Sequence, residues 1–450
     1  MSLDRSLKLE RLFLTLTTCP VGKLQARLYR APSGESRREA GCQVCHGNRL
    51  VCIQNPSLCP VYQRAKGLVE IERAVNKTVF NGPSPPGVFL GSADYPFLRA
   101  GPLVPILPSI DGIGDAAILD DPSRWLDTSI DDLVTYRFSL VRGKTRVKVA
   151  DARNPDRTLS LVQELALART PTETELHLTK KPQARIYILP RSAPHGPSGS
   201  IEKMMLTENT HVPRPVEKVT SDRDIGTQEG IFSLYERGVS QQQITRVFSV
   251  GQLGVFKNRR LVPTEWSITA VDDILGKSIL DRVRDFPQLG DFRVYGAEAL
   301  GNNVQVLLLP TAWMYEALEG WLTASTPQVY SDHEFHIGRR DYPSNIAGAY
   351  HAVKLPILEF LEREHRQAGA IAFLEVDRDW VPLGVWRFRE LARRALSGQP
   401  IVSSSLEASL SEVGQRLSIP LRSWIVSSKL VNHYKRQLPL DQFTMSRKGA

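Results

Sequence analysis

The sequence predicts an α+β fold: a mixed sheet core with helices, a small N-terminal segment organised by four cysteines, and a smaller, mostly helical C-terminal region. Three observations support this prediction. Short apolar runs with strand-like alternation are interspersed with longer segments of helical periodicity. Four of the five cysteines lie within residues 41–60, which indicates a compact metal-binding segment. The patterns near the C-terminus are mainly helical and include one buried strand.

Length and composition indicate a globular protein of two or three domains. The chain has 450 residues, of which 42% are hydrophobic and 23% are charged. Its longest apolar run, at residues 304–310, is far too short to span a bilayer, and no leader-like segment is present. We therefore expect a cytoplasmic, nucleoid-associated protein. The formal net charge of +9 favours a polyanionic partner such as DNA, although many proteins with no nucleic-acid role are equally basic.

The cysteine segment has the residue types and spacing of a closed metal site. Cys42 and Cys45 form a CxxC knuckle, and Cys52 and Cys59 follow after turn-forming residues. Four thiolates complete a tetrahedral shell, so a zinc ion bound here would be structural. An iron–sulfur cluster uses the same donor set and is the main alternative, ahead of two disulfides or ordinary buried thiols.

Three elements are predicted after the cysteines. Residues 63–77 place apolar side chains at helical spacing. Residues 81–105 are dense in proline and glycine, so we expect a long, ordered loop around a short strand at 88–90. Residues 133–150 alternate apolar and polar side chains on both sides of Gly143-Lys144, which predicts a hairpin with its turn at that dipeptide.

The next region is predicted to contain a strand at 183–190 and two helices within 224–250. The first helix should end at Gly238, Ser240 should cap the second, and Gly251 should end it. Two short helices before a basic segment suggest a helix-turn-helix, and a helical hairpin packed in a core is the commoner interpretation. The nucleic-acid-binding candidates in the basic segment are Arg259 and Arg260.

The remaining elements are two strands from residue 292 onward, a helix at 311–322, a helix through residues 358–360, a buried strand at 371–376 and a helix at 385–396. In the last of these helices we expect the apolar side chains to face inward and the arginines to face solvent. Those arginines are Arg387, Arg389, Arg393 and Arg394. After Trp424 the periodicity weakens, which predicts a polar tail.

A carboxylate-rich segment is the candidate catalytic site. If residues 332–336 form a strand, Asp332, Glu334 and His336 share one face, and Glu375 on a buried strand could add a ligand. Converging carboxylates of this kind bind Mg²⁺ or Mn²⁺ in two-metal phosphodiester chemistry. The alternative without a catalytic role is an exposed strand whose charged side chains form ordinary ion pairs. The neighbouring candidates for phosphate contact are Arg339 and Arg340.

The C-terminal tail carries a spaced motif of one glutamine, one aliphatic and one aromatic residue. Gln437, Leu440 and Phe443 fit a short 3₁₀ turn whose apolar side chains enter a pocket while the glutamine forms hydrogen bonds. The motif resembles the peptides that bind sliding clamps of the PCNA type. The usual second aromatic residue is replaced by Thr444, which predicts weaker binding.

Four separated blocks together resemble the Nre family of archaeal DNA-repair proteins. They read CQVCHGNRLVCIQNPSLCP, PPGVFLGSADYPFLRAGPLVP, RRLVPTEWSITAVDD and PLGVWRFRE. The resemblance implies an N-terminal and a C-terminal region that meet near residues 320–330, metal ligation by the four cysteines and a clamp-binding tail. It implies no particular reaction. Glu265 and Asp94 depart from the residues expected at their positions in the third and second blocks.

We therefore expect an arm and metal knuckle at 1–70, an α+β core at 71–325, a C-terminal region at 326–436 and a flexible clamp-binding tail at 437–450. The leading hypothesis is a DNA-repair factor that binds damaged or branched DNA and is recruited by the sliding clamp. The first alternative is a metal-dependent nuclease that uses the carboxylate cluster. The second is a repair scaffold with no DNA contact of its own.

Overall fold

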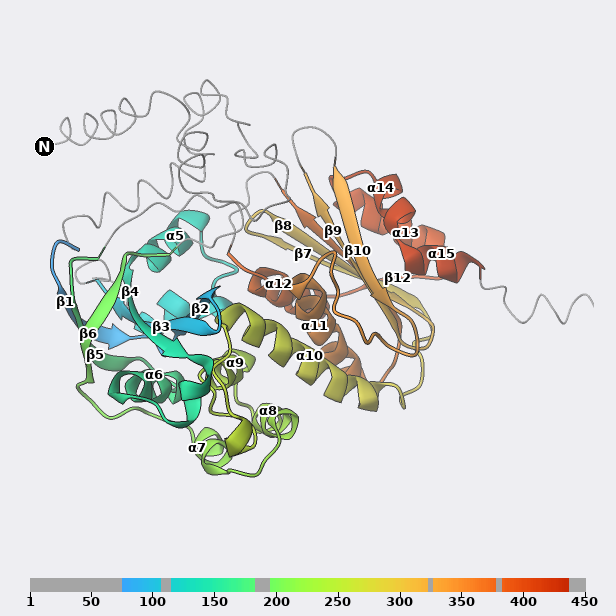
Figure 1. Ribbon diagram of the computed structural model, residues 1–450. Helices are drawn as coiled ribbons and strands as arrows, with labels where there is room; N and C mark the ends of the chain where they lie inside the picture. The colour runs from blue at the N-terminus through green and yellow to red at the C-terminus, as the bar shows by residue number, and fades with distance from the viewer. Residues whose placement is uncertain (1–74, 107–114, 183–194, 323–326, 378–382, 437–450) are drawn as a thin grey trace, which may run out of the picture.

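The computed structural model describes residues 75–106, 115–182, 195–322, 327–377 and 383–436. Within these ranges the chain forms two six-stranded mixed sheets and 11 α-helices, which confirms the predicted α+β class (Figure 1). None of the helices in the described ranges is long and apolar enough to cross a membrane. The cysteine segment, almost all of the predicted helix at 63–77, the predicted strand at 183–190 and the tail motif lie outside the described residues.

The first sheet has the order β1-β5-β6-β4-β3-β2. Its strands are β1 (Val79–Ser84), β2 (Val88–Asp94), β3 (Phe97–Pro105), β4 (Leu140–Lys148), β5 (Thr172–Leu178) and β6 (Ser198–Leu206). Only the β4–β6 pair among them is parallel. Helices α5 (Ile130–Phe138) and α6 (Arg157–Leu167) cover the apolar face, and contacts between β1 and β3 show that the sheet is strongly curled.

The predicted strand at 88–90 is confirmed as part of β2, but the long loop predicted around it is wrong, because residues 81–105 lie mostly in β1, β2 and β3. Proline and glycine are tolerated here since the alternate side chains still enter the core, as Leu98 and Ala100 do with complete burial. Gly101 is required by close packing of β3 on β4, where a Cβ atom would lie 2.0 Å from the carbonyl oxygen of Gly143. The density of glycine and proline therefore does not by itself indicate a loop, and Gly101 marks a close contact between strands.

The predicted hairpin at 133–150 is also wrong. Its first half is the helix α5, which Ser129 caps by accepting a hydrogen bond from the backbone N–H of Asp132, 3.1 Å away. Acidic residues in the first turn complement the helix dipole and further favour the helix. Its second half is the single strand β4, which runs straight through Gly143 and Lys144. Leu133, Val134 and Phe138 form the buried face of this helix, and the capping signal distinguishes the helix from a strand.

The two helices predicted within residues 224–250 are confirmed, and two further helices that the sequence analysis did not predict flank them. In chain order the four are α7 (Arg214–Ser221), α8 (Thr227–Glu236), α9 (Gln241–Ser249) and α10 (Thr264–Val283). Gly238, with φ of +74°, follows α8, and Ser240 caps α9 through the backbone N–H of Gln243. Gly251, with φ of +72°, follows α9. The pair packs inside the main core, as the commoner interpretation expects, and α10 runs from beside β2 along α11 (Figure 1).

The second sheet has the order β10-β9-β11-β8-β7-β12, in which only β9 and β11 pair in parallel. Its strands are β7 (Phe292–Ala299), β8 (Asn302–Leu309), β9 (Met314–Trp321), β10 (Gln328–Glu334), β11 (Gly369–Val376) and β12 (Ile401–Ser403). Helices α10, α11 (Gly348–Glu364) and α12 (Trp386–Ser397) cover one face. Helices α13 (Leu406–Arg416), α14 (Leu421–Ser427) and α15 (Lys429–Arg436) cover the other. Strands from both sides of residue 325 thus share one sheet.

Three predictions in this half need correction. The helix predicted at 311–322 is instead the interior strand β9 at 314–321, whose burial on both faces removes the alternation that identifies a half-exposed strand. In α12 the side chains of Phe388 and Leu391 face the core as predicted, but Arg387 and Arg389 are also buried, each with 5% of its surface exposed. The chain after Trp424 continues as α14 and α15, so a polar tail does not begin there. The strands near 292 and at 371–376 are confirmed.

Candidate nucleic-acid interface

Glu334, a predicted catalytic residue, is buried on β10 and fully engaged by protein donors. Its carboxylate accepts hydrogen bonds from the indole Nε1–H of Trp313 at 2.8 Å and the hydroxyl of Tyr350 at 2.9 Å. Lys354 completes the set with an ion pair of 2.7 Å, and its ammonium is buried as well. Burial raises the pKa of Tyr350, and burial lowers the pKa of Lys354. The arrangement is a structural ion pair with its hydrogen bonds satisfied.

Asp332 lies on the same face of β10 and is engaged in the same way. Its carboxylate accepts from the backbone N–H groups of Asn345 and Ile346, each at 2.9 Å, and pairs with Arg339 at 2.9 Å. The Arg339 guanidinium also donates to the carbonyls of residues 333, 341 and 342, so it holds the loop after β10. His336 lies beyond the end of β10, and its Nδ1 is 2.9 Å from the carbonyl oxygen of Trp313.

Glu375 points away from these two carboxylates. On β11 it shares a side with Phe373, which packs against α13–α15, whereas Asp332 pairs in register with Ala317, which faces α10–α12. Its oxygens accept from the backbone N–H groups of residues 418 and 419 at 2.9 and 2.7 Å. The structure thus places the three carboxylates on two faces of the sheet. The described part of the chain contains no group of three or more His, Cys, Asp or Glu side chains able to hold a metal ion.

The predicted DNA-contact arginines divide into two kinds. Arg259 is buried, and its guanidinium donates to the backbone carbonyls of Gly254, Thr220 and Asp222 at 2.6–2.9 Å. It therefore holds together the turns around α7 and α9, much as Arg339 holds the loop after β10. The arginines of this set that face solvent are Arg260 and Arg340.

A stronger basic surface lies on β4. Arg142, Lys144, Arg146 and Lys148 occupy alternate positions of the strand, so all four side chains leave the same face, while Val141 and Val147 enter the core. The neighbouring strand β3 adds Arg99, which stands opposite Arg146 in the register. Sequence reasoning missed this surface because a turn assumed at Gly143-Lys144 divided it. The sequence signal for this surface is the basic residue at every second position of residues 142–148 (RGKTRVK), which predicts one strand with a basic face.

Two aromatic side chains orient the arginines of this surface. The guanidinium carbon of Arg142 lies 3.8 Å from the ring centroid of Phe89, and that of Arg146 lies 3.6 Å from the centroid of Phe97. Stacking on a ring holds each planar guanidinium flat and leaves its outer side toward solvent or a ligand. We call this surface the basic face. Its residues are Phe89, Phe97, Arg99, Arg142, Lys144, Arg146 and Lys148.

The edge of the sheet beside the basic face carries an exposed aromatic pair. The rings of Tyr95, in the β2–β3 turn, and Trp266, in α10, lie 5.1 Å apart and are 55% and 47% exposed. Ser92 joins the same elements through its hydroxyl, which donates to Glu265 at 2.6 Å. The two positions that depart from the family pattern lie on these elements, Asp94 at the end of β2 and Glu265 in α10, and Asp94 pairs with Arg99 at 2.9 Å. Each adds a negative charge to this edge.

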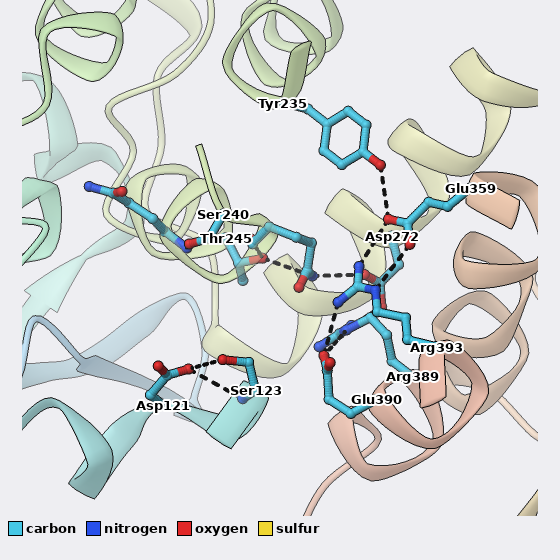
Figure 2. Close-up of polar contacts among 12 residues, drawn as sticks. Asp121, Ser123, Tyr235, Ser240, Thr245, Asp272, Glu359, Arg389, Glu390 and Arg393 are labelled. Carbon is cyan, nitrogen blue, oxygen red and sulfur yellow. Dashed lines mark hydrogen bonds and ion pairs between the residues drawn. The ribbon is translucent and has the colours of Figure 1, made fainter. Parts of the chain in front are cut away.

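Two of the family-like blocks are joined in the interior by the buried ion pair between Arg389 of α12 and Asp272 of α10. Figure 2 shows this pair with Thr245 of α9 and, beside it, Arg393 bound to Glu359 at 2.9 Å. Gln241 donates to Asp272 at 2.8 Å, and burial raises the pKa of that carboxyl group. This network fixes α9, α10, α11 and α12 against one another.

Comparison with known proteins gives consistent results over most of the chain. The model of the family region "Archaeal Nre, N-terminal" matches residues 53–327, and that of "Archaeal Nre, C-terminal" matches residues 334–443. A DNA repair protein NreB from Archaeoglobus fulgidus is 33% identical over 409 residues, which are 89% of this chain and 99% of the relative. A DNA repair protein NreA from the same organism is 33% identical, over 84% and 93% of the two chains.

A DNA repair protein NreA from Haloferax volcanii is also 33% identical, over 78% of this chain and 86% of the relative. No solved structure matches the chain significantly. The matched regions include both sheets and the basic face, and the relatives are aligned over nearly their whole length. This chain is a member of the archaeal Nre family.

Proposed function

We propose that this protein is a DNA-repair factor that binds damaged or branched DNA through the basic face and is recruited by a sliding clamp of the PCNA type through its C-terminal tail. The relatives named DNA repair proteins support the repair role. The observation that carries DNA binding is the row of four cations on one face of β4, with two arginines stacked on aromatic rings. Recruitment by the clamp would concentrate the protein on DNA without high intrinsic affinity.

The geometry of the basic face suits an unpaired strand. Alternate residues of a strand are about 6.6 Å apart, so a nucleic-acid backbone along β4 would meet successive cations. Bases turned toward the sheet could stack on the guanidinium planes of Arg142 and Arg146 and on the exposed rings of Tyr95 and Trp266. Damaged and branched DNA offers such unpaired bases, whereas intact duplex does not.

The test is a titration of fluorescent duplex, gapped and forked oligonucleotides at several salt concentrations. We expect the gapped and forked substrates to bind more tightly than the duplex, and log K to fall linearly with log salt concentration because phosphate contacts release counterions. An affinity that is negligible at low salt would favour the scaffold alternative. An affinity that does not respond to salt would rule out the basic face as the contact surface.

The four cysteines are proposed to bind one structural zinc ion, since four thiolates are the donor set that such sites use. Elemental analysis of the purified chain should find about one zinc ion per molecule. Replacement of Cys42 and Cys45 by serine should remove it, and replacement of Cys19, which lies outside the motif, should not. Iron together with inorganic sulfide would instead identify the iron–sulfur alternative. Zinc content that also falls on changing Asp332 would contradict this assignment.

The tail motif predicts a graded clamp interaction. Replacing Phe443 or Gln437 by alanine should weaken binding to the clamp about tenfold or more, because a buried aromatic anchor and a fixing hydrogen bond are lost. Gln442→Ala is the matched control and should have little effect. Restoring the second aromatic residue with Thr444→Phe should strengthen binding. These affinities can be measured by calorimetry with the full chain. Equal affinity for Phe443→Ala and the unmodified protein would exclude the motif.

A further inference from the structure

The basic face continues, at the start of β4, into a partly enclosed cluster of three arginines. Arg142 comes from β4, Arg137 from the last turn of α5, and Arg246 from α9. They surround one carboxylate, Asp120, at the end of the 3₁₀ helix η2 (Ala116–Asp120). Three separate elements of the fold thus converge on one point with basic side chains.

The described protein groups do not satisfy these arginines. Arg137 pairs with Asp120 at 2.9 Å, and Arg246 donates to the backbone carbonyl of Ala168 at 3.2 Å. The guanidinium of Arg142 stacks on Phe89 and has no hydrogen bond or ion pair with any described residue. The Nε–H groups of all three arginines are buried without an acceptor among the described residues. Buried donors of this kind are rare because each one carries its full desolvation cost.

The charges in the cluster do not balance. Three guanidinium groups face the single carboxylate of Asp120, and of the charged groups nearby, Lys144 and Asp121 offset each other. The carboxylate of Asp120 packs directly against Gly87. A Cβ atom added to that glycine would lie 1.7 Å from Oδ2 of Asp120. His195 contributes no charge near neutral pH, because burial and then Arg142 lower its pKa to about 4. Counted over the described residues, the site therefore carries a surplus of about two positive charges.

Burial makes this surplus costly. It lowers the pKa of Arg142 to about 9 and the pKa of Arg246 to about 10, with burial the largest cause in both cases. Removing charges from water without a partner destabilises the folded protein, and a bound anion would offset this destabilisation. Arg99 and Arg146, by comparison, are more open to solvent on the same basic face.

We propose that Arg137, Arg142 and Arg246 form a binding site for a phosphate monoester, carried either by the end of a DNA strand or by a free nucleotide. A monoester carries about two negative charges near neutral pH and so balances the surplus, whereas an internal diester carries one. Guanidinium groups match phosphate oxygens in pairs. The DNA-end form rests on the proposed function, since a strand lying along β4 would bring its terminus here.

The experiment compares oligonucleotides of one sequence that end in phosphate or hydroxyl at either the 5′ or the 3′ terminus, bound to the full chain. We expect one phosphorylated end to bind about tenfold more tightly than its hydroxyl counterpart, as for one or two charge-assisted hydrogen bonds. Arg142→Met should abolish this difference. Arg146→Met is the matched control, because Arg146 is stacked on Phe97 from the same strand and face. It should weaken both oligonucleotides equally.

A second measurement uses the unmodified protein, so that it does not depend on variants that fold. Deoxynucleoside monophosphate should raise the melting temperature and compete with the phosphorylated end, whereas the corresponding nucleoside should do neither. Stabilisation by the monophosphate without discrimination between DNA ends would assign the site to a free nucleotide. If neither the monophosphate nor the end chemistry has an effect while DNA still binds, the phosphate site is wrong and the DNA-binding proposal stands. Stabilisation by the monophosphate in a protein that does not bind DNA would support the phosphate site and overturn the DNA-binding proposal.

Discussion

Replacing Glu334 with alanine is expected to lower the free energy of unfolding by about 3–5 kcal/mol. The reason is that the change leaves the buried ammonium of Lys354 without its counter-charge, and the indole of Trp313 and the hydroxyl of Tyr350 without their acceptor. The loss should appear as a lower urea midpoint with an unchanged m-value. This places Glu334 among the groups that hold β9, β10 and α11 together.

Two further variants make the result specific. Replacing both partners with apolar side chains, as Glu334→Leu with Lys354→Met, should recover much of the lost stability, because an apolar pair leaves no buried charge. Glu364→Ala is the control. It removes an exposed carboxylate at the end of α11, the helix that carries Lys354, and should change the free energy of unfolding by less than about 0.5 kcal/mol. A Glu334→Ala protein as stable as the unmodified chain, but deficient in divalent-metal-dependent cleavage, would instead support the nuclease hypothesis.

The sequence was informative wherever a local signal decides the structure. Gly238, Ser240 and Gly251 correctly bounded α8 and α9, because capping and positive-φ positions are set by neighbouring residues. The same kind of signal, Ser129 before two aspartates, was available for α5 and was outweighed by an apparent alternation. Strand β9 gave no usable signal of its own, since a strand buried on both faces has the same composition as a buried helix.

Whether the predicted catalytic carboxylates lie close together depends on the register of the strands more than on residue type. Asp332 and Glu375 read alike as acidic residues on strands, and only the pairing of β10, β9 and β11 shows that they face opposite sides of the sheet. The burial of Arg389 likewise depends on Asp272, which is 117 residues away in the chain. Such contacts come from tertiary packing, so periodicity alone cannot reveal them. The four cations of β4 in the basic face, by contrast, lie on a single strand, so their alternation in the sequence was sufficient to predict that they share a face.

The other large effect is expected on DNA binding when the exposed cations of the basic face are removed together. A chain with Lys144, Arg146 and Lys148 all changed to alanine should lose about a hundredfold in affinity for a gapped oligonucleotide at moderate salt. The slope of log K against log salt concentration should decrease in magnitude by about 2 to 3, because about three phosphate contacts are lost. Stability should change little, since Arg146 and Lys148 are exposed and the one hydrogen bond of the Lys144 ammonium to a described residue is to Ser198, at 2.7 Å.

The matched control removes three other exposed cations, Lys180, Lys218 and Arg237, so that both variants carry a formal net charge of 9 − 3 = +6. If DNA responded only to the overall charge of the protein, the two variants would lose affinity equally. Direct contact along β4 predicts that the control keeps most of its affinity and nearly all of its salt slope. Since the terminal-phosphate preference is assigned to Arg137, Arg142 and Arg246, it should survive in the β4 variant even as total affinity falls. That separation distinguishes a surface that follows the backbone from a site that recognises its end.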